Sequence, residues 1–159
     1  MHSEKRQQES GNTIIEFAIV ATVFFMMLVG IVAAGNLYYT HNALVEATRR
    51  GARYAVLQCK PDLSGCTNSS TTTDRVKDIV VYATDAPATG ARSVISGLQT
   101  SNVTVTYSSD FGLAKGTVTV TIENYTFPFV LPHETTSITM PPYSTTLTGE
   151  SAGFIPPNL

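Results

Sequence analysis

The chain has 159 residues, with 10 lysine and arginine and 12 aspartate and glutamate side chains, which give a formal net charge of -2. The net charge is near zero although the charges are unevenly spread, and nothing in the sequence indicates a polybasic surface for nucleic acid. Outside one long apolar segment, the remaining length is enough for one small domain and not two. The sequence therefore predicts one membrane helix plus one domain.

An apolar segment close to the N-terminus dominates the sequence. No residue from 17 to 35 carries a charge, and two isoleucines extend the segment past a single acid, Glu16. The hydrocarbon core of a bilayer needs about 20 apolar residues of helix, so we expect a membrane span at about residues 14–35. The polar residues 1–11 before it resemble a short cytoplasmic leader.

Three interpretations of the leader and the apolar segment compete. A secretory signal peptide would be cut near Ala34 and would release a soluble secreted binding protein, but its apolar region is usually 7 to 15 residues long, shorter than this segment. A plain membrane anchor would stay uncut. Cleavage after Gly11 would leave the helix attached, with Asn12 as the first mature residue and Glu16 as the fifth.

The charges on the two sides of the apolar segment favour opposite orientations of the helix in the membrane. Lys5 and Arg6 precede the segment, but three arginines follow it within the 15 to 20 residues over which flanking charge acts. We expect the C-terminal part to be exported, because it is rich in threonine and holds a closely spaced cysteine pair.

Helical periodicity continues beyond the membrane span to Leu57. Apolar or small residues recur at helical spacing at Leu37, Leu44, Gly51 and Ala55. A helix over residues 12–57 cannot bury its apolar stripe alone, so a domain or further copies of the chain must pack on it.

Cys59 and Cys66 lie in a segment rich in proline, glycine and serine that reads as a loop. Two cysteines at this spacing can close a small disulfide loop in an oxidising compartment, and the alternative is two free thiols. Export of this segment favours the disulfide.

A short helix is expected after this loop. Thr72 or Thr73 can cap it, and an apolar stripe repeats at i, i+3, i+4 and i+7 from Val76 to Ala83. A further helical turn is expected over residues 91–97, after a break marked by proline and glycine.

The pattern then changes to a period of two, which is typical of strands. Residues 103–107 and 117–122 alternate apolar and polar side chains, so we expect an antiparallel hairpin. Several prolines break the sequence that follows, and residues 137–140 and 143–148 are candidates for edge strands.

These elements predict an α+β fold, in which a long N-terminal transmembrane helix packs with a small C-terminal domain of a short helix and an antiparallel sheet. The expected segments are a leader (1–11), the long helix (12–57) and an exported domain (58–159). We found no catalytic constellation, and the histidines have no cysteine or acid at metal-ligand spacing. We therefore expect a protein that is not an enzyme and holds no metal or cofactor.

Glu16 needs an explanation, because an acid at the centre of a bilayer costs about 2.5 to 3.5 kcal/mol. At the bilayer edge its carboxylate can reach the headgroups at a lower cost. Cleavage after Gly11 gives a second explanation, because the new amine of Asn12 would be a cation near the same depth. In a bundle, Glu16 of one subunit would neutralise a neighbour's amine and fix axial register, since an unpaired buried charge is much worse than a paired one.

The same residues resemble a known family. Gly11 followed by NTIIEF resembles the processing site of type IV pilin-like proteins of the tight-adherence class. EFAIV at 16–20, GI at 30–31 and ATRRGARYA at 47–55 are similar to the TadE-like pseudopilins. The segments SNVTVTY and YTFPF agree with the family more loosely.

The resemblance implies that a prepilin peptidase cuts between Gly11 and Asn12, and that Glu16 and Phe17 act in assembly and register. It implies a pilus subunit that acts in assembly, initiation or adhesion. Its partners would be the membrane, other pilin or pseudopilin subunits and the pilus assembly platform. The precursor would lie in the bacterial inner membrane with its N-terminus in the cytoplasm and its domain in the periplasm, and the assembled form would reach the cell surface.

The chain departs from the family at two places. Members commonly have a proline where this chain has Thr22, and an acid and an arginine where it has Ala33 and Asn36. Neither difference affects the cleavage site. Together they leave open whether this is a minor component or the main subunit of a filament.

Three small residues are candidates for close helix packing. Gly30 and Ala34 have the small-xxx-small spacing that permits close approach of membrane helices, although ordinary membrane composition explains them equally well. Gly51 is expected to let the sheet pack on the rod, since a glycine inside a helix costs up to about 1 kcal/mol relative to alanine.

Overall fold

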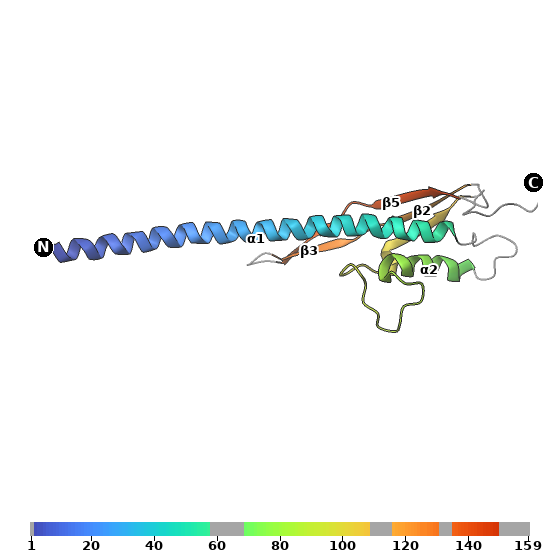
Figure 1. Ribbon diagram of the computed structural model, residues 1–159, viewed down its shortest axis with the longest axis horizontal. Coiled ribbons are helices and arrows are strands. Elements are labelled where there is room, and N and C mark those ends of the chain that lie inside the picture. The colour runs from blue at the N-terminus through green and yellow to red at the C-terminus, as the bar shows by residue number, and fades with distance from the viewer. Residues whose placement is uncertain (1, 58–68, 109–115, 131–134, 150–159) are drawn as a thin grey trace, which may run out of the picture.

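A long helix forms the spine of the molecule (Figure 1). The structure, a computed structural model, describes residues 2–57, 69–108, 116–130 and 135–149. Helix α1 runs from His2 to Val56, which is about 80 Å at roughly 1.5 Å per residue. It includes the expected long helix and also continues through residues 2–11, so the polar N-terminal residues extend the same rod.

A shorter helix, α2 (Ser69–Tyr82), lies beside the C-terminal end of α1 (Figure 1). Of the apolar stripe that predicted this helix, Val76 and Val80 are buried against α1 and the sheet, Ile79 is half-buried, and Ala83 is exposed and lies just after the helix. The expected caps are wrong, because α2 begins at Ser69 and both Thr72 and Thr73 lie inside it. The expected helical turn over 91–97 is also wrong: these residues form turns and bends, and the 3-10 helix η1 (Thr100–Asn102) follows them.

Side-chain contacts with backbone carbonyl groups stabilise the C-terminal end of α2. The Arg50 side chain of α1 donates hydrogen bonds to the carbonyl oxygens of Ile79 (3.2 Å) and Val80 (3.3 Å). These carbonyls belong to the last turn of α2, where a positive charge is favourable. Ala83 ends the helix in a left-handed conformation (φ +60°), and its amide donates to the Ile79 carbonyl.

Replacing Ala83 with glycine is expected to stabilise the protein. The left-handed conformation costs an L-residue about 1–2 kcal/mol, and glycine avoids this cost. The greater freedom of glycine in the unfolded chain offsets about 0.4–1 kcal/mol of the resulting gain in stability. We expect the free energy of unfolding to rise by about 0.5–1 kcal/mol in a urea titration followed by circular dichroism. The control is Ala91→Gly, at a position without a positive φ, which should not stabilise the protein. An unchanged or lower stability for Ala83→Gly would contradict the prediction.

Three strands form an antiparallel sheet in the order β1-β2-β5. They are β1 (Val103–Tyr107), β2 (Thr117–Ile122) and β5 (Tyr143–Thr148). The expected hairpin is confirmed, with Val103 opposite Ile122, and the expected strand over 143–148 pairs with the other edge of β2. Alternation places the valines of β2 on the buried face and its threonines on the other.

A second antiparallel hairpin separates β2 from β5 along the chain. It consists of β3 (Thr126–Val130) and β4 (Thr135–Thr139). Strand β4 confirms the expected edge strand near 137–140, two residues earlier than predicted. Strand β3 was not expected, because Pro128 was interpreted as a break. Proline is tolerated there because, among the described residues, β3 pairs on one side only and therefore has a free edge.

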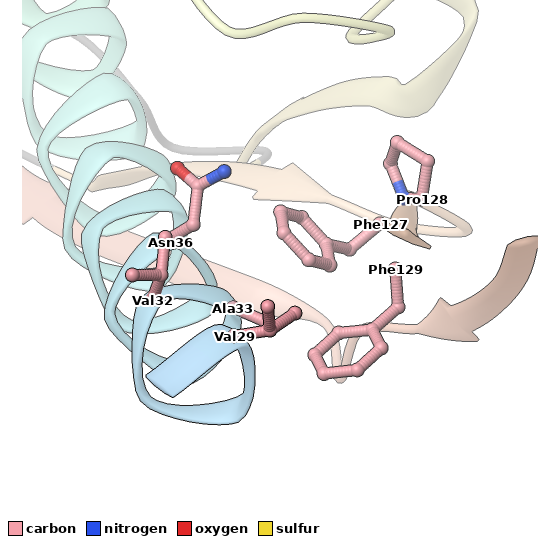
Figure 2. Close-up of a pocket in the computed structure, with 7 residues that line it drawn as sticks. All are labelled: Val29, Val32, Ala33, Asn36, Phe127, Pro128 and Phe129. Atoms are coloured by element: carbon pink, nitrogen blue, oxygen red, sulfur yellow. The ribbon is translucent and has the colours of Figure 1, made fainter. Parts of the chain in front are cut away.

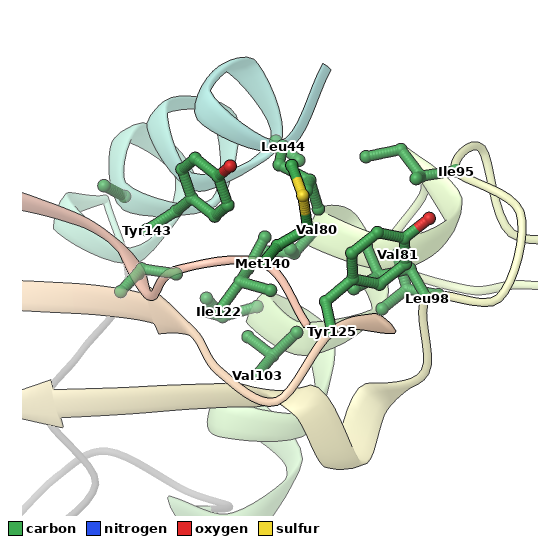
Figure 3. Packing of buried hydrophobic residues seen from close by; sticks show 14 of the residues in the cluster. Leu44, Val80, Val81, Ile95, Leu98, Val103, Ile122, Tyr125, Met140 and Tyr143 are labelled. Atoms are coloured by element: carbon green, nitrogen blue, oxygen red, sulfur yellow. The ribbon is translucent and has the colours of Figure 1, made fainter. Parts of the chain in front are cut away.

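The hydrophobic core lies between the C-terminal part of α1, helix α2 and the inner face of the sheet (Figure 3). Its buried members include Leu44, Ala47, Ala52 and Ala55 of α1, Val76, Val80 and Val81 of α2, and Val118, Val120 and Ile122 of β2. The hydrophobic core of the domain thus involves α1 from about residue 37 to residue 56. The expected α+β arrangement is confirmed, whereas Cys59 and Cys66 lie outside the described residues.

Candidate functional site

The N-terminal part of α1 carries many large apolar side chains that are exposed. The exposed members are Ile14, Ile15, Phe17, Ile19, Val20, Val23, Phe24, Phe25, Met26, Met27, Leu28, Ile31 and Val32. Phe17, for example, is 72% exposed. An apolar surface of this extent marks a membrane or protein contact. Within the described residues, α1 is the helix that is long and apolar enough to cross a membrane.

Glu16 lies on this exposed part of α1, directly before Phe17. Asn12 is also exposed and lies four residues earlier, so both side chains occupy the same face of the helix, with about 5–6 Å between their Cβ atoms. Gly11 lies within the same continuous helix. A positive charge at the backbone nitrogen of Asn12 would therefore be close to the Glu16 carboxylate of its own chain and accessible to that of a neighbour.

Gly30 and Ala34 lie one turn apart on the exposed helix. A Cβ atom added at Gly30 would meet nothing within 4 Å. The helix therefore has room for the backbone of another helix at Gly30, whereas Ala34 lines a pocket with Ile138 and Thr139 of β4. A role in packing between subunits stays a prediction, because it needs a second copy of the chain.

Gly51 has the opposite environment. It is buried, and an added Cβ would overlap Cγ2 of Val80 and lie 3.4 Å from Cγ1 of Val120. The expected contact with the sheet exists through Val120 of β2, but the nearer neighbour is Val80 of α2. The absence of a side chain at position 51 lets α2 approach the spine closely.

Comparison with known proteins identifies this part of the chain. Residues 11–53 match the family model of TadE-like proteins. This segment of the chain is TadE-like. The match confirms the resemblance found in the motifs. No curated protein and no solved structure matches the chain.

The TadE-like segment thus includes both the bare apolar helix and most of the surface on which the domain packs. Two polar pairs join that surface to β5. His41 Nδ1 lies 2.8 Å from the Tyr143 hydroxyl, and the Thr48 hydroxyl lies 2.9 Å from that of Thr145. Burial raises the pKa of Tyr143, so its hydroxyl keeps its proton at neutral pH. No local sequence pattern indicates these pairs, because each joins residues about one hundred positions apart.

Tyr54, which directly follows the matched residues 11–53, connects α1 to the segment that follows α2. Its hydroxyl donates a hydrogen bond to Asp85 at 3.3 Å. Burial and, to a smaller extent, the negative charge of Asp85 raise the pKa of Tyr54, so this donor also stays protonated. These groups fix the domain on its spine, and none of them forms a catalytic constellation. Within the described residues, no three histidine, cysteine, aspartate or glutamate side chains gather as a metal site.

Proposed function

We propose that the protein is a pilin-like structural subunit, a pseudopilin or minor pilin, of a tight-adherence pilus, and that it is not an enzyme. One observation carries the proposal: the TadE-like segment is a bare apolar helix that continues without a break into the spine of a small α+β domain. The N-terminal part of α1 can hold such a chain in a membrane while the domain stays outside. The same helix can pack side by side with other subunits in a pilus.

Processing by a prepilin peptidase between Gly11 and Asn12 is part of the proposal. The family match begins at Gly11, which supports a boundary at this position. Glycine inside a helix also lowers its local stability by up to about 1 kcal/mol relative to alanine, which favours local opening for cleavage. The mature chain would keep the entire apolar helix, with Glu16 as its fifth residue.

The proposed topology follows from the same arrangement. The precursor lies in the bacterial inner membrane, with residues 1–11 in the cytoplasm and the α+β domain in the periplasm. From there, the pilus assembly platform and other pilin or pseudopilin subunits would take up the mature helix. The domain would then face outward on the pilus, where it acts in assembly, initiation or adhesion.

The N-terminal sequence and intact mass of the protein from its native membranes test this proposal. We expect a chain that begins at Asn12, because the proposed cut leaves the apolar helix attached. A Gly11→Val variant is expected to keep residues 1–11, since it changes the residue directly before the cut. A native chain that begins at Gly35 would indicate a secreted domain, and one that begins at Met1 a plain anchor. Either result contradicts the proposal.

A further inference from the structure

The β3–β4 hairpin lies beside the part of α1 that is expected to enter the membrane. The hairpin extends from the domain back along the helix towards its N-terminus (Figure 1). Phe127, Pro128 and Phe129 of β3 enclose a cavity of about 230 Å³ together with Val29, Val32, Ala33 and Asn36 of α1 (Figure 2). The rings of both phenylalanines lie on the helix side of the hairpin.

The length of the apolar helix requires the bilayer to reach the level of the hairpin. Residues 14–28, which precede the hairpin contact, extend over only about 22 Å at roughly 1.5 Å per residue. The hydrocarbon core is about 30 Å thick. The apolar segment from residue 14 to residue 33 extends over about 30 Å, so the hydrocarbon core ends at the level of the hairpin contact.

Two tyrosines support the same position for the membrane boundary. Tyr38 and Tyr39 are exposed and follow the end of the apolar segment at residue 35 after two further residues, and tyrosine is enriched at the interface between membrane and water. Ala33, which contacts the hairpin cavity, lies five residues before Tyr38, or about 8 Å deeper along the helix. This depth matches the roughly 5–10 Å to which interfacial elements enter the boundary between headgroups and acyl chains.

The hairpin has the composition of an element at the membrane interface. The described strands, TFPFV and TTSIT, carry no charged side chain. Phe127 lies opposite Ile138, and Ile138 is 41% exposed. Within the described residues the two strands pair only with each other, so their outer edges need hydrogen bonds from outside the hairpin. Lipid headgroups and water can supply these bonds, whereas hydrocarbon cannot.

We propose that the β3–β4 hairpin docks on the lipid surface, at the headgroup layer of the leaflet that faces the domain. There it limits how deeply α1 enters the membrane. It also fixes which face of the helix the domain covers. This inference rests on the proposed function, because it requires α1 to cross a membrane with the domain outside.

Single tryptophans can test the docking, because the natural chain contains none. Ile138→Trp and Phe129→Trp place a probe on each strand of the hairpin. The full chain is reconstituted in vesicles of phosphatidylethanolamine and phosphatidylglycerol that contain phosphatidylcholine brominated near the headgroup or near the chain end. Phe24→Trp reports on the membrane span, and Leu57→Trp reports on the far end of α1; both native side chains are exposed.

We expect shallow bromines to quench the emission of both hairpin probes more than deep bromines do, with a blue shift relative to the Leu57→Trp variant. Phe24→Trp should be quenched and Leu57→Trp should not. A quenched probe at position 24 with unquenched hairpin probes would overturn the docking and leave the membrane span intact. An unquenched probe at position 24 would overturn both. If Phe129→Trp misfolds by circular dichroism, the more exposed position 138 decides the result.

Discussion

Replacing Glu16 with alanine is expected to abolish pilus assembly while the protein stays in the membrane. Insertion does not need the acid, because a carboxylate in a membrane helix is itself unfavourable by up to about 2.5 to 3.5 kcal/mol at the bilayer centre. In the assembled pilus, however, the variant would leave the amine of Asn12 without its partner. Removing one member of a buried charge pair costs about 3–5 kcal/mol, which exceeds a hundredfold change in an equilibrium constant.

The readouts are the number of pili seen by electron microscopy and the amount of subunit in the membrane fraction. Glu16→Gln keeps the size of the side chain and removes its charge, so it should fail in the same way. Thr22→Ala is the matched control: Thr22 is exposed on the same helix, and its hydroxyl donates a hydrogen bond to the carbonyl of Ala18 (2.8 Å). This variant should assemble normally. Normal piliation by Glu16→Ala would refute the register mechanism.

Periodicity predicted most of the elements, because they are long or strictly alternating. The apolar run and the helical spacing that follows it specified α1 almost to its last residue. The strands at 103–107 and 117–122 were predicted at their observed bounds, since valine and threonine alternate there between a buried face and an exposed one. Such patterns reflect burial on one face, which the local sequence itself encodes.

The missed elements depend on context that no local pattern contains. Strand β3 includes Pro128, and only the free edge of a two-stranded hairpin makes that residue compatible with a strand. Helix α2 begins at Ser69, before the threonines that could have capped it. Its close packing and the Arg50 contacts with its last turn come from α1, far away in the sequence.

The candidate site likewise has features that the sequence predicts and features that it does not. The bare helix, Glu16 and the TadE-like motifs are contiguous in the sequence and could be found there. The position of the hairpin beside Val29 and Ala33 could not, because it depends on how the sheet docks along the rod. This placement brings residues about one hundred positions apart to the same level of α1.

Replacing Gly51 with leucine is expected to destabilise the packing of the domain on α1 more than the other substitutions in the domain considered above. A Cβ alone would overlap Val80, and the longer side chain would also crowd Val120. Overpacking of a core typically costs about 1–3 kcal/mol and sometimes more. For Gly51→Leu we expect the upper part of this range, about 3 kcal/mol, which is a large share of the roughly 5–15 kcal/mol that stabilise a domain. Unfolding by urea in detergent, followed by the near-ultraviolet circular dichroism of the tyrosines, measures the loss.

Smaller substitutions separate crowding at Gly51 from a general effect of changing a helix glycine. Gly51→Ala should cost less than Gly51→Leu, because both residues regain helix propensity but alanine adds only a Cβ atom to the crowded site. Gly35→Ala has the same propensity gain with nothing within 4 Å of the new Cβ, so it should not destabilise the domain. Combining Gly51→Ala with Val80→Ala removes the overlapping methyl group, and we expect a favourable coupling of about 0.5–3 kcal/mol. Strictly additive effects would show that Gly51 is not what allows α2 to approach the spine.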